Sequence, residues 1–267
     1  MKILVPTDFS KNAQKGIEFA AKTVKAPGSE IVLLHAHQII DTASPIRKML
    51  FEEYNLSVAR KLHHELKVQK RKVETVNPGI TVSAELYSNE VNNSIVDASE
   101  KLGIDLIVMG TQGASGLKNF FMGSVTARVI GKAAVPVLAV PRLYKWRQPE
   151  NILLATNSFE THPEILNAIF TLVDLYKANL HVIVFTDTDT ANPEEYRNHK
   201  NGLDDYIMFL EKINKDILIT SAHLKGSEFE DTVQKYIDDH SIDMLAMITY
   251  KRNFLENIFH RSATKNM

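Results

Sequence analysis

The first 141 residues alternate short apolar runs with segments in which apolar residues recur at a helical spacing. The runs have the length of buried strands, and they are residues 2–7, 30–37, 81–88, 105–110 and 135–141. The intervening patterns predict helices, and they cover residues 11–26, 45–75, 93–103 and 123–133. Continuous apolar strands separated by helices are typical of a parallel sheet covered on both faces. We therefore predict an α/β fold with a doubly wound, open, parallel sheet.

Two residues mark predicted helix ends. Ser10 stands just before the first helical pattern, where a hydroxyl oxygen can accept from a free backbone N–H. Gly103 stands at the end of the third pattern, where a residue with positive φ commonly closes a helix.

The pattern occurs twice along the chain. Residues 82–111 align without a gap on residues 220–249, at an offset of 138, and residues 2–10 match residues 151–159 at an offset of 149. The offsets differ by 11, so the second copy is expected to be that much shorter between the two aligned blocks, and the middle crossover is the favoured place. A period of this length indicates a duplicated domain and not a solenoid.

The repeat predicts domains at 1–144 and 149–267, joined by the polar, proline-containing segment 142–150. Met267 is the equivalent of Val129, so the second copy is expected to lack its last strand. An intramolecular pseudo-dimer of the two copies and a true homodimer both stay open.

Composition narrows the function classes. Lys and Arg number 31 against 32 Asp and Glu, so the basic excess of a general nucleic-acid binder is missing. The chain has no cysteine, which excludes disulfides and thiolate chemistry. Neither a signal peptide nor a membrane span is expected. We therefore expect a soluble, cytoplasmic protein without nucleic-acid or membrane partners.

Four of the eleven glycines fall within residues 108–126, between a strand and a helix: Gly110, Gly113, Gly116 and Gly123. The spacing, Gly-x2-Gly-x9-Gly-Ser, matches neither a Walker A loop nor the dinucleotide fingerprint. Glycines permit positive φ and bring backbone N–H groups close to an anion, and Ser124 and Thr126 begin a helix whose N-terminus favours phosphate. The alternative is a tight strand-to-helix loop without a ligand.

These residues resemble the universal stress protein family. The resemblance rests on ILVPTDFS at the first strand, GIDLIVMGT at the fourth, the glycine loop and VPVLAVP, and it covers residues 1–141. Residues 150–267 resemble a degenerate member, so the chain looks like a tandem universal stress protein. The resemblance implies a Rossmann-like fold, similar to the adenine nucleotide alpha hydrolases, and ATP, with or without Mg²⁺, in the first copy. The residues implied to contact ATP are Pro6, Thr7, Asp8, Ala36, Met109, Gly110, Gln112, Gly113, Gly123, Ser124, Val125 and Thr126.

The second copy has lost this pattern. Its residues at the four glycine positions are Ile248, Lys251, Phe254 and Arg261, and Asn157 replaces Asp8. Side chains there occupy the space that a phosphate needs, and Ile does not adopt positive φ cheaply. We expect no second ATP site and no cofactor in the second copy.

Other functions are less favoured. His35 with His37, and His63 with His64, lack a third ligand at a metal-binding spacing. Efficient phosphoryl transfer needs a metal-holding carboxylate and a positioned cation, but Asp8 is the one carboxylate expected at the site. We therefore expect a stress-response protein that uses ATP as a sensor or regulatory ligand. The alternatives are a slow ATPase or autophosphorylating enzyme, with at most weak hydrolysis, and a nucleotide-free dimerisation scaffold.

Overall fold

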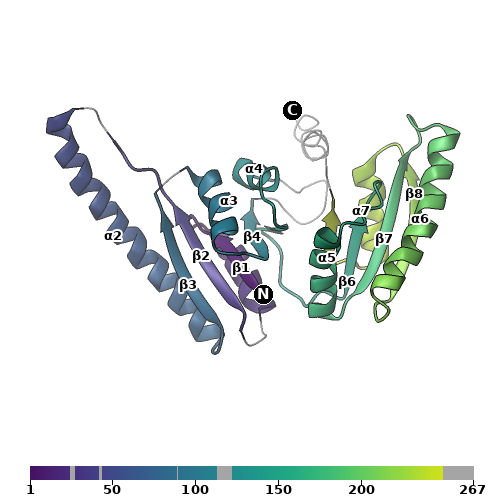
Figure 1. Cartoon of the computed structure of the whole chain (residues 1–267), viewed down its shortest axis with the longest axis horizontal. Helices are drawn as coiled ribbons and strands as arrows, with labels where there is room; N and C mark the ends of the chain where they lie inside the picture. The colour runs from purple at the N-terminus through teal and green to yellow at the C-terminus, as the bar shows by residue number, and fades with distance from the viewer. Residues whose placement is uncertain (25–27, 42–43, 89, 113–121, 249–267) are drawn as a thin grey trace. The chain divides into compact units, whose positions relative to one another are not determined.

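The computed structural model of the chain describes residues 1–24, 28–41, 44–88, 90–112 and 122–248. The described residues form two compact units: unit 1 runs to Tyr144, and unit 2 begins at Lys145. Each contains a parallel sheet covered by helices, as Figure 1 shows.

Unit 1 contains a five-stranded parallel sheet with the order β3-β2-β1-β4-β5. The order reverses at β1, because the chain winds outward through β2 and β3 and then crosses to β4 and β5 on the other side. The strands are β1 (Lys2–Pro6), β2 (Glu30–Ala36), β3 (Thr81–Tyr87), β4 (Leu106–Thr111) and β5 (Val137–Pro141). This arrangement confirms the predicted doubly wound α/β fold.

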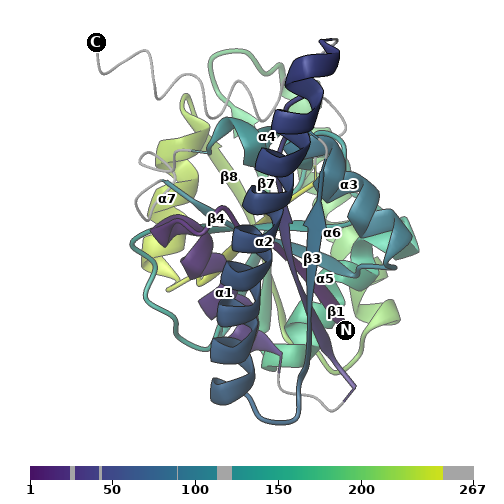
Figure 2. The same ribbon diagram turned by 90° about the vertical axis from the view of Figure 1, so that its left-hand side faces the viewer.

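Helices cover both faces of this sheet. They are α1 (Lys11–Thr23), α2 (Pro45–Val76), α3 (Val91–Lys101) and α4 (Ser124–Ile130). Helix α1 packs on β4 and α2 on β3, where α2 runs across the front of the sheet in Figure 2. Side chains of α3 and α4, among them Ile95 and Val129, share the core of the opposite face with Leu4 and Ile107. Burial on both faces explains why the strands read as continuous apolar runs.

The predicted helix ends at Ser10 and Gly103 are confirmed. The Ser10 hydroxyl accepts from the backbone N–H of Ala13 at 3.2 Å and caps α1. Gly103 has a φ of +61° and follows the last residues of α3. The prediction for α4 was too long, because this helix ends at its C-cap Gly131 and not at residue 133.

Unit 2 contains a four-stranded parallel sheet with the order β8-β7-β6-β9. The strands are β6 (Asn151–Ala155), β7 (Asn179–Asp187), β8 (Ile219–Gly226) and β9 (Met244–Met247), and the helices are α5 (Pro163–Tyr176), α6 (Pro193–Ile213) and α7 (Phe229–Asp239). The order matches β3-β2-β1-β4 of unit 1, and residues 145–248 contain no fifth strand of this sheet. The predicted four-stranded second sheet is therefore confirmed for the described residues.

The difference in length lies in the middle crossover. Helix α2 has 32 residues and its counterpart α6 has 21, a difference of 11 that equals the difference between the two sequence offsets. The strand pairing agrees, since Ile3 pairs with Leu106 in unit 1 and the equivalent Ile152 pairs with Met244 in unit 2.

The strand pairing of β8 differs by one residue from the gapless alignment of residues 82–111 with residues 220–249. Ile31 pairs with Val82 in unit 1, but the equivalent Leu180 pairs with Ile219, one residue before the aligned Thr220. A shift of one residue turns every side chain of a strand to the other face. The shift places Ala222 and Leu224 in the apolar core beneath α7, so burial of these side chains decides the register.

Candidate functional site

The predicted contact residues gather at the carboxyl ends of the central strands of unit 1. Pro6 ends β1, Ala36 ends β2, and Met109 and Gly110 lie in the last half of β4. Thr7, Asp8 and Gln112 follow directly after these strands, while Gly113 and Gly116 lie outside the described residues. Parallel strands end at the same edge of a sheet, and the crevice beside the point where strand order reverses is the usual ligand position.

Thr7 anchors the turn that follows β1. Its N–H donates to the carbonyl oxygen of Leu34 at 2.8 Å, and its hydroxyl oxygen accepts from the N–H of Phe9 at 3.1 Å. The same hydroxyl donates to Oε1 of Gln69 on α2 at 3.2 Å. The side chain is buried, at 5% exposure, so Thr7 holds the turn and leaves the open surface to its neighbour.

Asp8 is that exposed neighbour. Its Oδ1 accepts from the N–H of Ser10 at 3.0 Å, which orients the carboxylate. Within the described residues Oδ2 has no hydrogen-bond donor, and the side chain is exposed at the carboxyl edge of the sheet. A carboxylate oxygen accepts hydrogen bonds and does not donate them, so Asp8 suits a ligand that carries hydroxyl or amino donors.

Gly110 is required for packing, not for an unusual backbone angle. Its φ lies outside the left-handed region, but an added Cβ would overlap the backbone carbonyl group of Asn12 at the start of α1. A Cβ on Gly16 of α1 would in turn approach the Gly110 nitrogen to 3.0 Å. The expectation that a positive φ explains this glycine is therefore wrong, because close contact between α1 and β4 explains it.

Gly123 has no such packing constraint. It is the N-cap of α4 with a φ of −58°, and an added Cβ would meet no atom within 4 Å among the residues that the structure describes. Ser124 and Val125 are exposed at the start of α4, whereas Thr126 is 4% exposed. Of the two hydroxyls expected to face a phosphate, that of Ser124 is the exposed one.

At the carboxyl edge of the unit 2 sheet, an amide side chain bridges two strand ends. Asn157, the counterpart of Asp8, donates from Nδ2 to the carbonyl oxygen of Phe185 at 3.1 Å and accepts from the Phe185 N–H at 3.2 Å. Phe185 is the counterpart of Ala36. The amide therefore bridges the ends of β6 and β7, and a carboxylate cannot make the same pair of bonds because it has no donor.

A polar cluster in unit 2 was missed by the sequence interpretation. The Thr186 hydroxyl lies 2.7 Å from Nδ1 of His199 and 2.7 Å from Nε2 of His223. Burial, followed by the charges of His199, Lys225 and Lys200, lowers the pKa of His223 below its ordinary value of 6.5. These residues have no shared spacing in the sequence, and strand register and the placement of α6 bring them together.

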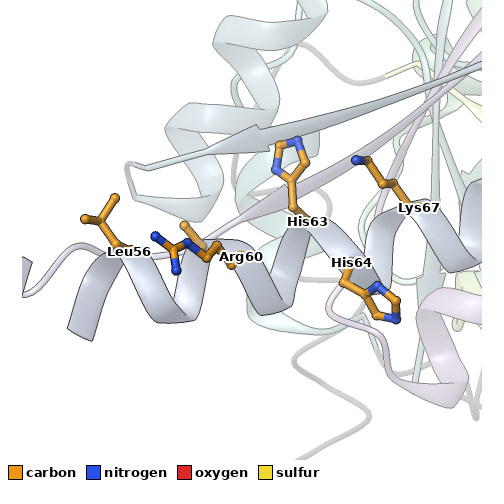
Figure 3. Close-up of a pocket in the computed structure, with 6 residues that line it drawn as sticks. Leu56, Arg60, His63, His64 and Lys67 are labelled. Atoms are coloured by element: carbon orange, nitrogen blue, oxygen red, sulfur yellow. The ribbon is translucent and has the colours of Figure 1, made fainter. Parts of the chain in front are cut away.

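Figure 3 shows a surface pocket on α2. It is lined by Leu56, Ala59, Arg60, His63, His64 and Lys67. All six belong to α2, and His63 and Lys67 project on one side of the helix while His64 projects on the other. This pocket is a shallow feature of one helix surface and contains none of the predicted contact residues.

The described residues contain neither a metal-binding cluster nor a membrane-spanning helix. No group of three or more His, Cys, Asp or Glu side chains there is arranged to hold a metal ion. His35 instead contacts a backbone carbonyl, with Nδ1 at 2.7 Å from the Thr7 oxygen. No helix in the described ranges has the length and apolarity needed to cross a bilayer.

Comparisons with known proteins agree with this architecture. A universal stress protein of Methanocaldococcus jannaschii is 34% identical over 158 residues, which cover 53% of this chain and 94% of that protein. The universal stress protein YxiE of Bacillus subtilis is 27% identical over 144 residues, covering 52% of this chain and 97% of that protein. The crystal structure of a universal stress protein from Archaeoglobus fulgidus matches with a TM-score of 0.68 at 20% identity, and covers 92% of this chain and 86% of that one.

A match to a protein-family model assigns the chain to a family. The model described as the universal stress protein family matches residues 1–141, which form the five-stranded sheet and its helices. The matched region contains the edge at which Asp8 and Gly123 are found. The chain belongs to the universal stress protein family.

Proposed function

We propose that unit 1 binds ATP at the carboxyl edge of β1 and β4, and that nucleotide occupancy serves as a regulatory signal. The observation that carries this proposal is Gly123, where an added Cβ would meet no atom of the described residues within 4 Å. Gly123 therefore leaves its backbone open to a ligand, since glycine has no side chain to cover it. The helix N-terminus that follows offers free N–H groups to a phosphate.

Asp8 supports the same proposal from the other side of the edge. Its free Oδ2 and exposed position suit a ribose hydroxyl or an adenine amino group. Among the predicted contact residues Asp8 is the sole carboxylate, and phosphoryl transfer requires further charged groups to hold a metal and stabilise the transition state. Mg²⁺, when bound with ATP, would be held chiefly by the phosphates. The proposal is therefore binding and not efficient hydrolysis.

Calorimetric titration with ATP and magnesium tests the proposal. We expect wild-type protein to bind one ATP per chain, and Gly123→Arg, which introduces the residue type of the second copy, to bind at least roughly tenfold more weakly. Gly131→Arg is the matched control, because this exposed glycine at the other end of α4 has an unstrained φ of −71°.

Two results of this titration would contradict different parts of the proposal. Absence of ATP binding by the wild-type protein would overturn the proposed function. Equal weakening by Gly123→Arg and Gly131→Arg would show that the start of α4 has no special part in binding.

A further inference from the structure

The turn after β1 contains a strained residue. Phe9 has a φ of +64°, in the left-handed region that bulky residues rarely adopt. Such a conformation persists only where surrounding contacts enforce it, and strained residues of this kind cluster at functional sites. Phe9 directly follows Asp8, so the contacts that enforce its conformation also fix the orientation of Asp8.

His35 supplies those contacts. It lies near the end of β2, and its Nδ1 is 2.7 Å from the carbonyl oxygen of Thr7. A carbonyl oxygen can only accept, so Nδ1 bears the proton and donates. The imidazole also packs on the Phe9 ring, with ring centroids 4.7 Å apart and planes 30° apart. One side chain thus holds the residues on both sides of Asp8.

The equivalent turn of unit 2 differs at several of these positions. The counterpart of His35 is Val184, and the counterpart of Phe9 is Ser158. The positive φ is then found one position later, at Phe159. In that unit the residue at the Asp8 position, Asn157, bonds to Phe185 instead of remaining free. The histidine and the free carboxylate therefore occur together in unit 1 and are both absent from the equivalent turn of unit 2.

We propose that His35 is a positioning residue for the nucleotide site: it holds the strained turn at Thr7 and Phe9 so that Asp8 presents its free oxygen to the ligand. This inference rests on the proposed ATP site and assigns a role within it to a side chain that does not itself contact the ligand.

Two substitutions of His35 test the hydrogen bond. His35→Leu removes the donor, and we expect ATP affinity to fall roughly tenfold. His35→Asn replaces Nδ1 with an amide N–H at nearly the same position, and we expect it to restore affinity to within about threefold of wild type. His63→Leu, the same change on the exposed surface of α2, is the matched control and is expected to have no effect.

A double-mutant cycle then asks whether His35 acts through Asp8. In an Asp8→Ala background, His35→Leu is expected to change ATP affinity by less than about twofold, because the residue being positioned is already gone. An undiminished tenfold effect in that background would overturn the positioning role. So would wild-type affinity in His35→Leu, or failure of His35→Asn to restore binding.

Phe9→Gly gives a second route if His35→Leu does not fold. Glycine accepts positive φ without strain, so the turn can still form, but glycine also reaches many other conformations and therefore orients Asp8 less firmly. We expect a folded protein with weakened ATP binding, and unchanged affinity would count against the proposal. Absence of ATP binding by the wild-type protein would instead indicate failure of the proposed function.

Discussion

At the scale of single residues, the two described glycines of the loop motif have different physical origins. Gly110 lies against the backbone of α1, whereas Gly123 faces open space. The sequence alone presents both as members of one motif. The structure separates a glycine that the fold requires from a glycine that we attribute to ligand approach.

Because the two glycines have different surroundings, the same change to alanine is expected to affect stability at Gly110 and ATP binding at Gly123. Gly110→Ala is expected to lower the free energy of unfolding of unit 1 by about 2–4 kcal/mol, because the new Cβ must push α1 away from β4. Gly123→Ala is expected to change stability by less than about 0.5 kcal/mol while weakening ATP binding. Urea unfolding and ATP titration of both variants measure the two effects. Equal stability of the two variants would contradict this interpretation.

A second residue-scale prediction concerns the closed edge of unit 2. Asn157→Asp removes the N–H that donates to the Phe185 carbonyl and places a carboxylate oxygen beside it. We expect unit 2 to lose about 1 kcal/mol of stability, without gaining ATP binding. Asn157→Ala provides a control that removes both bonds without adding charge. Greater stability of Asn157→Asp than of the wild-type protein would show that the Asn157 bridge contributes nothing.

At the scale of elements, the strands and helices of unit 1 follow closely from the sequence. Apolar runs and caps such as Ser10 are local signals, because each depends on a few neighbouring residues. The register of β8 could not be read in the same way. It depends on which side chains find space beneath α7, and the aligned sequence gives no access to that contact.

Elements also assemble polar side chains that the sequence keeps apart. Thr186 of β7, His199 of α6 and His223 of β8 meet in this way. On the other side of unit 2, His181 of β7 is buried and its Nδ1 lies 3.1 Å from the Tyr236 hydroxyl of α7. Burial, followed by the charge of His240, lowers the pKa of His181.

The lowered pKa values of His181 and His223 predict that unit 2 loses stability in acid. A histidine with a folded-state pKa below its ordinary 6.5 binds fewer protons in the folded state than in the unfolded state at pH values between the two. Its contribution to stability is therefore complete above pH 6.5 and is lost as the pH falls through the window below that value. Unit 2 should thus weaken on acidification.

Hydrogen exchange of β7 and β8 amides, corrected for intrinsic rates, measures this effect between about pH 7.5 and about pH 5.5. We expect protection in these strands to fall at the lower pH, and His223→Gln to reduce the dependence. Protection that rises on acidification would contradict the sign of both pKa shifts.

At the scale of the whole molecule, one architecture is present twice with different strand-end chemistry. The described sheets share the order of four strands, and α2 is 11 residues longer than α6. Among the described residues, Oδ2 of Asp8 in unit 1 has no donor and Gly123 has no atom near an added Cβ, whereas the Asn157 amide bridges the equivalent strand ends of unit 2. We infer that unit 1 is the nucleotide sensor and that unit 2 has a structural or interaction role.

The sequence by itself determined the fold class and the repeated strand order of the two halves, and it predicted a candidate site at the strand ends of the first copy and none in the second. These features follow from apolar periodicity and from residue types at aligned positions, which are properties of the chain. Only the tertiary structure decided why Gly110 is a glycine, where β8 pairs, and that His35 contacts Thr7 and Phe9 on either side of Asp8. Each of these depends on contact between segments distant in sequence, such as Asn12 with Gly110 and His35 with Thr7, and packing fixes such contacts.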